Sequence, residues 1–355
     1  MTAASPAVGS TSAGNTGPGW RRLVASAVSP GVWVTALPFP SALSYSYSYC
    51  VRYSGGVVVV DLGWDTAEGW RTFQLGLNRA GVTLDEVIGV VISHTHPDHY
   101  GFAAAIKQYT PAWIATHGAE RPLIAATAAE RTARVDEMAE WLQRCGVPDS
   151  EMAELVHEDA ELQAAMPYVQ PDFDLIDGDP VPGTGGSLVP VHTPGHTPGH
   201  LCFHDRERNL LFTGDHLLPR VTPNVPKRPR STVDPLADFL ASLDRLARFE
   251  QPLVLPGHEW AFDRLAGRTA AVRSHHDRRL DEIEAAVTQG ARTVWDVARS
   301  VGWSRQFDTL DPRGRRQALG ETYSHLYRLS RSGCVVMQEG TPERWAPRQG
   351  SRVTP

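Results

Sequence analysis

Hydrophobic and polar positions in the first 118 residues alternate between two periods. Small and aromatic side chains alternate at 44–50, which predicts a strand with one tyrosine face. Gly55 and Gly56, inside the next apolar stretch, predict the turn of a hairpin. The pattern then predicts a helix at 66–81, a buried strand at 86–93, a helix at 101–110 and a strand at 111–118. This order is typical of a layered α/β protein.

Residues 118–172 interrupt the alternation. They are rich in Ala, Glu and Leu and helix-like, with a break at 145–148, so we predict a helical insertion between two halves of a sheet domain. Its apolar side chains would either cap an acyl pocket or pack the insertion onto the sheet. These side chains are Trp141, Leu142, Met152, Leu155, Leu162 and Met166. Further strands and turns are predicted at 187–193, 201–205, 209–218 and 252–260, with a helix at 235–249.

The C-terminal part of the chain has a different pattern. It predicts helices at 275–290, 293–303 and 315–333, followed by strand, turn and strand at 334–347. Three helices and a hairpin predict a winged helix-turn-helix arrangement. The predicted domains are therefore a disordered tail at 1–20, rich in Ala, Ser, Thr, Gly and Pro, a sheet domain at 21–265 and a winged-helix domain at 266–355.

Composition changes this picture little, whereas charge adds a question. The chain has 355 residues, 41% of them hydrophobic, and no apolar run long enough for a bilayer. Its four cysteines form no CxxC pair, which favours a reducing cytoplasm over a disulfide framework. The net charge is −6, but the residues from Trp260 onward include 16 arginines and only 11 acidic residues. This surplus indicates either an anionic partner or a solvated surface.

The strongest chemical signal is the segment ISHTHPDHYG at 92–101, where a predicted strand gives way to a helix. It contains His94, His96, Asp98 and His99, and loops at strand carboxyl ends are where α/β proteins place their chemistry. Imidazole and carboxylate together suit zinc, iron or manganese. Four donors within six residues do not easily close one tetrahedron, but they can serve two adjacent metals. Matching donors follow other predicted strands, namely His196 in TPGHT, Asp215 in FTGDH and His258 in LPGHE.

The motifs HTHPDH, TPGHT, TGD and PGHE, in this order, resemble the metallo-β-lactamase fold and its glyoxalase II-like branch over residues 21–265. The tail from 266 resembles the winged-helix module of the branch that includes the human β-lactamase-like protein 2. The resemblance implies an αββα sandwich that holds two divalent metal ions, with zinc expected and iron or manganese as alternatives. It implies His94, His96 and His196 on the first metal, Asp98, His99 and His258 on the second, Asp215 as the bridge, and Asp61 as the acid that orients the loop.

Two neighbouring repeats make the choice of His196 a prediction of its own. In PVHTPGHTPGHL, at 190–201, three histidines are spaced by four residues. Proline and glycine between them exclude a helix, so they do not share one helical face. The family pattern selects His196, while His200 begins the next strand and His192 ends the previous one. We therefore expect neither His200 nor His192 to bind metal.

Two metals predict hydrolysis by a shared water that loses a proton near neutral pH, with Asp98 as the candidate proton acceptor. The aspartate at the bridging position resembles thioester and phosphodiester hydrolases more than lactam hydrolases with a cysteine there. We expect an acyl thioester or ester as a small-molecule substrate. A metal-dependent endoribonuclease and a nucleic-acid-binding regulator remain as alternatives, and a homo-oligomer through the C-terminal module stays open. The loop after Asp215 supplies basic residues for an anionic tail such as coenzyme A phosphates, or for RNA: Arg220, Lys227, Arg228 and Arg230.

Overall fold

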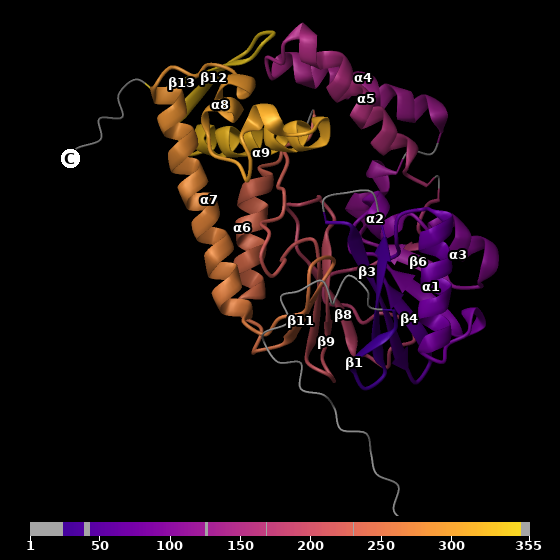
Figure 1. Ribbon diagram of the computed structural model, residues 1–355. Coiled ribbons are helices and arrows are strands. Elements are labelled where there is room, and N and C mark those ends of the chain that lie inside the picture. The colour runs from indigo at the N-terminus through magenta and orange to yellow at the C-terminus, as the bar shows by residue number, and fades with distance from the viewer. Residues whose placement is uncertain (1–23, 39–42, 125–126, 168, 230, 349–355) are drawn as a thin grey trace, which may run out of the picture.

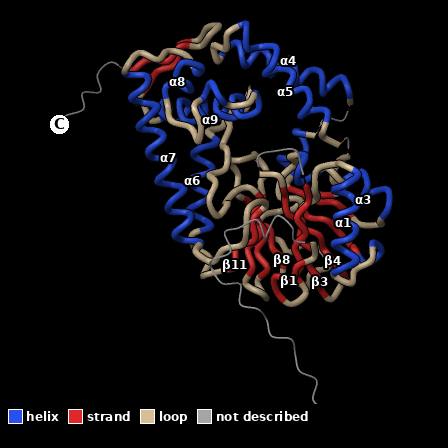
Figure 2. The backbone as a smooth tube through the Cα atoms, in the orientation of Figure 1, coloured by secondary structure: helices blue, strands red, loops and turns tan. Residues whose placement is uncertain are grey.

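The computed structural model describes residues 24–38, 43–124, 127–167, 169–229 and 231–348. The predicted tail at 1–20 and the basic candidate Arg230 lie outside these ranges. Two β-sheets lie face to face in the lower part of the view, and a separate group of helices lies above them (Figures 1 and 2). Within the described ranges, no helix combines the length and the apolar character that crossing a membrane requires.

The larger sheet has seven strands in the order of the sequence. They are β1 (Ser26–Ser29), β2 (Val32–Pro38), β3 (Tyr45–Tyr53), β4 (Gly56–Val60), β5 (Val87–Val91), β6 (Trp113–Thr116) and β7 (Phe173–Asp174). Strands β1 to β4 pair antiparallel, whereas β4 to β7 run parallel. The predicted hairpin turn at Gly55 is confirmed, and Gly56 has a φ of 138°, which only glycine adopts without strain. The sequence patterns did not predict strands β1 and β2.

The second sheet has four strands in the order β11-β10-β9-β8. Their bounds are β8 (Leu188–His192), β9 (Leu201–Asp205), β10 (Leu210–Gly214) and β11 (Leu253–Pro256). Only β10 and β11 run parallel to each other. These strands match the four strand-and-turn units predicted between 187 and 260.

Alternation along β4 explains the layers. Val58 and Val60 pack between the two sheets, while Val57 and Val59 pack on the outer face. Helices α1 (Ala67–Arg79), α2 (Pro97–Tyr100) and α3 (Ala103–Tyr109) lie on the side of the larger sheet, and α6 (Pro235–Leu246) covers the smaller one (Figure 1). The result is the predicted four-layer αββα arrangement.

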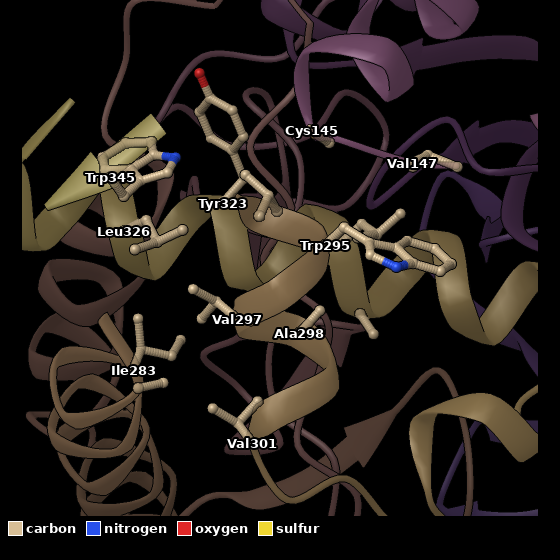
Figure 3. Packing of buried hydrophobic residues seen from close by; sticks show 14 of the residues in the cluster. Cys145, Val147, Ile283, Trp295, Val297, Ala298, Val301, Tyr323, Leu326 and Trp345 are labelled. Atoms are coloured by element: carbon tan, nitrogen blue, oxygen red, sulfur yellow. The ribbon is translucent and has the colours of Figure 1, made fainter. Parts of the chain in front are cut away.

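The insertion packs on the C-terminal helices rather than on the sheet. It contains α4 (Ala128–Arg144) and α5 (Asp149–Ala164), after the 3-10 turn η3 (Gly118–Leu123). The C-terminal elements are α7 (Leu265–Thr288), α8 (Val294–Ser300), α9 (Pro312–Arg331), β12 (Val335–Gln338) and β13 (Arg344–Pro347). Cys145 and Val147 of the insertion share one hydrophobic cluster with Trp295 and Tyr323 of these helices (Figure 3). The expectation that the insertion packs onto the sheet is therefore wrong, because its apolar face has a different partner.

Ion pairs reinforce the same contact. Arg315 of α9 pairs with Glu151 and Glu154 of α5, and Arg316 pairs with Glu158 at 2.6 Å. Part of the arginine surplus in the C-terminal region is thus neutralised within the chain. The three helices and the hairpin occur as predicted, while their identification as a winged-helix domain and the domain boundaries stay predictions.

Helix α7 connects the two parts of the molecule. Leu265 and Val272 pack with α6 beside the smaller sheet, whereas Ile283 and Val287 belong to the cluster that the insertion shares. The helix begins ten residues before the predicted start at 275. Its first turn has no capping signal, since the N-cap residue Arg264 makes no side-chain hydrogen bond there.

Candidate metal centre

Four of the seven predicted donors follow β5, two on the loop after the strand and two in α2. Strand β5 ends at Val91, and Pro97 occupies the first turn of α2, where its missing N–H costs nothing. The short helix turns Asp98 and His99 back toward the strand end. All four donors, His94 included, are buried or nearly so.

The other three donors arrive from the second sheet. His196 lies on the loop between β8 and β9, Asp215 directly follows β10, and His258 follows β11. Because β10 and β11 are parallel, their carboxyl ends meet at one edge of the sheet. The seven donors predicted from scattered motifs therefore converge at one edge of the sandwich.

The first group of donors is a triangle of three imidazoles. The Nδ1 atom of His96 lies 2.9 Å from Nε2 of His94 and 3.1 Å from Nε2 of His196. A tetrahedral zinc with nitrogen ligands at about 2.0–2.1 Å has ligand edges of about 3.3 Å. Both of these distances are close to one edge of a zinc tetrahedron, and the third pair of ligand atoms lies within 4.8 Å.

The second group combines two imidazoles and two carboxylates. Oδ2 of Asp98 lies 3.6 Å from Nε2 of His99 and 3.3 Å from Nε2 of His258. Oδ1 of Asp215 lies 3.4 Å and 3.2 Å from the same two nitrogens. The other oxygen of Asp215, Oδ2, lies 3.9 Å from Nε2 of His196 in the first group. Asp215 thus stands between the groups with one oxygen toward each.

Hydrogen bonds behind the rings determine which nitrogen faces the centre. Nδ1–H donates to the Asn224 carbonyl from His196 and to the Tyr45 carbonyl from His258, both at 2.7 Å. Nδ1–H of His99 donates to Asp61 at 3.0 Å. When these rings are neutral, each Nε2 atom carries a lone pair toward the other donors.

A bound cation would satisfy the several lone pairs that point toward one another in this site. Among the described residues, Nε2 of His99 and Oδ1 of Asp215 are buried without a hydrogen-bond partner. Nδ1 of His96 carries at most one hydrogen, so it cannot satisfy both His94 and His196. Metal ions accept all of these lone pairs at once, so the donor set fits two divalent ions.

The pKa shifts show the same electrostatic strain. Burial lowers the pKa of His94 and His96 well below the usual value, so both rings are neutral and able to bind metal. Burial also opposes a charge on His258, but Asp215 and Asp98 raise its pKa to about 10. Burial acts to raise the pKa of Asp98, but His99 and His258 outweigh it and hold this pKa well below its usual value. A carboxylate that stays ionised is a poor proton acceptor, which favours the ligand role of Asp98 over the predicted catalytic one.

Two acidic residues hold the loop from behind, and only one of them was predicted. Asp61 accepts hydrogen bonds from the Ser93 amide and hydroxyl, both at 2.7 Å, besides the one from His99. Glu120 is fully buried and accepts from the Thr95 amide and hydroxyl and from the Gly199 amide. Glu120 therefore ties the first histidine loop to the TPGH loop, a role with no local sequence signal.

The neighbouring histidines occupy supporting places. His200 is buried, donates from Nδ1 to the Thr193 hydroxyl at 2.9 Å and accepts at Nε2 from the Asp215 amide at 3.3 Å. Both of its nitrogens are therefore used in positioning the neighbouring chain. His192 stacks on His117 with ring centroids 4.0 Å apart, outside the two donor groups.

The basic loop residues divide into two kinds. Arg220 is mostly exposed and pairs with Glu259 at 3.1 Å, beside the ligand candidate His258. Lys227 is buried and Arg228 half-buried, and both line a cavity on the insertion side of the loop. Arg230 lies outside the described residues.

Similarity to known proteins agrees with this centre. The family model of the metallo-β-lactamase superfamily matches residues 42–258, a range that includes all seven donors. The chain belongs to the metallo-β-lactamase superfamily. Metallo-β-lactamase superfamily proteins typically bind divalent metals, and this member is a hydrolase with histidine and aspartate groups suited to them.

Individual relatives within the metallo-β-lactamase superfamily differ in how much they match. The human acyl-coenzyme A thioesterase MBLAC2 is 31% identical over 273 residues, which cover 72% of this chain and 88% of that protein. The lactamase-like protein aptB of Emericella nidulans is 31% identical over only 147 residues, 41% of this chain and 43% of aptB.

The crystal structure of the metallo-beta-lactamase family protein TTHA1429 from Thermus thermophilus has a TM-score of 0.76 at 29% identity. The structural match covers 91% of this chain and 100% of the TTHA1429 chain. The structural similarity therefore extends beyond the residues that the family model matches.

Proposed function

We propose that this protein hydrolyses acyl thioesters or esters with two divalent metal ions, zinc being the expected ion. The observation that carries the proposal is the position of Asp215, with one oxygen toward each of two complete donor groups. Ions held by these groups would supply Lewis acidity and the activation of water near neutral pH. His94, His96 and His196 would hold one ion and Asp98, His99 and His258 the other, with Asp215 between them.

We expect the protein's own residues to position the metal ions and the substrate, and not to attack the substrate as nucleophiles. None of the four cysteines belongs to the donor groups, and none forms a disulfide, which fits the predicted reducing compartment. Burial raises the pKa of Cys50 and Cys202 to about 12 and that of Cys145 well above its usual value. A thiol that stays protonated is a poor nucleophile, so water is the expected attacking group.

An acyl thioester is the substrate class with most support. The human relative MBLAC2, which matches 72% of the chain, is named an acyl-coenzyme A thioesterase. The endoribonuclease alternative expects free arginines in the C-terminal part to hold phosphates. Arg315 and Arg316 are instead paired with glutamates of α5. We also propose, on resemblance, the glyoxalase II-like branch and a winged-helix module from residue 266.

A substrate panel tests the proposed function. Zinc-loaded protein would be assayed with an acyl-coenzyme A, a lactone and single-stranded RNA, beside Asp215→Ala as the inactive control. We expect thioester hydrolysis that a chelator abolishes and zinc restores. Metal-dependent RNA cleavage without thioester hydrolysis would instead establish the ribonuclease.

A further inference from the structure

A cavity lies among the helical insertion, the loop after Asn224 and the C-terminal region. It has a volume of about 380 Å³ and is enclosed by the end of α4, the loop after Asn224, α9 and the turn of the C-terminal hairpin. The lining residues that matter here are Trp141, Arg144, Lys227, Arg228, Tyr323 and Glu343. The insertion and the C-terminal region thus enclose this space together.

A short stretch of chain joins the cavity to the metal centre. The Asn224 carbonyl accepts the 2.7 Å hydrogen bond from His196, and Arg228 follows four residues later. Four residues span at most about 14 Å even when fully extended. Arg228 therefore lies within about 14 Å of the residue that binds His196.

Most charges around the cavity already have partners. Lys227 donates to the Ser231 carbonyl and lies 4.4 Å from the centre of the Tyr327 ring. Glu343 accepts from the Tyr323 hydroxyl at 2.7 Å and faces Arg144 at 3.9 Å. These groups therefore hold one another in place.

Among the cations that line the cavity, Arg228 is the exception. Across the described part of the chain, its guanidinium makes no hydrogen bond and no ion pair, although the residue is half-buried. The indole N–H of Trp141, which lines the same cavity, is also buried without an acceptor. The carboxylates of Glu120 and Asp159 act on Arg228 through space, but neither pairs with it directly, and Asp159 pairs with Arg316 instead. A half-buried guanidinium without a direct partner can take an anion, and a phosphate is the anion that its planar fork matches best.

We infer that this cavity binds the phosphate end of a phosphopantetheine-type thioester, with Arg228 as the contact to phosphate. The inference rests on the proposed function, because it assigns the thiol half of the thioester substrate. A thioester of coenzyme A or phosphopantetheine carries its phosphate at the far end of a flexible arm. The thioester can then reach the metal centre while the phosphate occupies the cavity.

The test compares one acyl group on three thiols, namely coenzyme A, phosphopantetheine and pantetheine, which lacks phosphate. Arg228→Met removes the charge and Arg228→Lys retains it without the planar fork. Arg299→Met is the matched control, because Arg299 is exposed, pairs with Asp308 at 2.8 Å and does not line the cavity. Thermal unfolding of each variant reports whether it folds as the wild type does.

We expect Arg228→Met to lower kcat/KM for the two phosphorylated substrates by about 10- to 100-fold, the loss of one charge-assisted hydrogen bond. The pantetheine thioester should change less than about twofold, and Arg228→Lys should recover part of the loss. A loss confined to the coenzyme A substrate would place the contact at the nucleotide end of the molecule. Equal losses on all three substrates would overturn the inference, because Arg228 would then act on the centre itself.

Binding separates this inference from the proposed function. Calorimetry with free coenzyme A should show binding to the wild type that weakens about tenfold or more in Arg228→Met. If no thioester is hydrolysed but this binding is found, the proposed function fails and the phosphate site stands. If thioesters are hydrolysed but coenzyme A binds both proteins equally, the phosphate site fails alone.

Discussion

Asp61→Asn isolates one hydrogen bond behind the metal centre. Asp61 has a φ of 58°, a left-handed conformation that asparagine also tolerates, so the backbone need not move. The amide oxygen can keep the 2.7 Å hydrogen bond from the Ser93 amide. The amide nitrogen then replaces Oδ2, and the Ser93 hydroxyl can rotate to accept from it.

His99 cannot adapt without cost. Its Nδ1–H, 3.0 Å from Oδ2 of Asp61, would face an NH2 group. Moving the proton to Nε2 relieves this contact but removes the lone pair that faces Asp98 and Asp215. Keeping the proton leaves a buried donor unsatisfied, at about 1–3 kcal/mol. Changes behind metal ligands typically weaken metal affinity by about 10- to 100-fold, equivalent to about 1.4–2.8 kcal/mol, so the two magnitudes agree.

The assay is a zinc titration against a competing chelator. We expect one of the two sites to weaken by about 10- to 100-fold and excess zinc to restore most of kcat. Asp205→Asn is the matched control, because Asp205 is equally buried but bonds Tyr53 at the opposite end of the second sheet. Unchanged affinity at both sites in Asp61→Asn, or the same loss in Asp205→Asn, would refute the reasoning.

The remaining predictions concern the ligands, their support and the thiols. Purified protein should hold two transition-metal ions per chain by elemental analysis, and Asp215→Ala should lower this content and abolish hydrolysis; full metal content in that variant would exclude the bridge. His196→Ala should lose metal while His200→Ala retains it, and the reverse result would shift the ligand by one TPGH repeat. Glu120→Gln should reduce kcat about tenfold or more at full metal loading, measured by steady-state kinetics, since it replaces one carboxylate oxygen by a donor; wild-type kcat would contradict the tie between the two loops. Iodoacetamide at pH 8 should label Cys334 alone by mass spectrometry, since the other three thiols are buried and their raised pKa values keep them protonated; labelling of any of those three in the folded protein would contradict this.

The metal centre was predictable because each donor group is a local signal at a strand end. HTHPDH follows β5, while Asp215 and His258 follow β10 and β11, so strand order alone brings them to one edge. The ligand candidate His196 needed the family pattern, because TPGH occurs twice within twelve residues. Hydrogen bonds distinguish the repeats physically, because His196 donates to Asn224 and keeps Nε2 for the centre, whereas His200 uses both ring nitrogens on Thr193 and the Asp215 amide.

Other features depend on contacts that no local pattern encodes. Glu120 joins Thr95 and Gly199, which lie 25 and 79 residues away along the chain. Trp141 and Leu155 form an apolar face that predicts burial, but the pattern does not reveal what covers it. Their partners belong to the C-terminal helices, which lie more than 100 residues later in the chain. A local pattern cannot identify contacts between segments that are so far apart in sequence.

The hydrophobic cluster that the insertion shares with the C-terminal helices can form only late in synthesis. Helix α5 ends at Ala164 and α9 begins at Pro312, so about 150 residues are translated before the insertion can bury Trp141 and Leu155. At about 5–20 residues per second, this interval lasts on the order of ten seconds. During that time the nascent chain exposes an apolar helical pair that its own sheets do not cover. A ribosome that stalls before α9 would therefore leave this apolar pair of helices exposed, a state that is prone to aggregation.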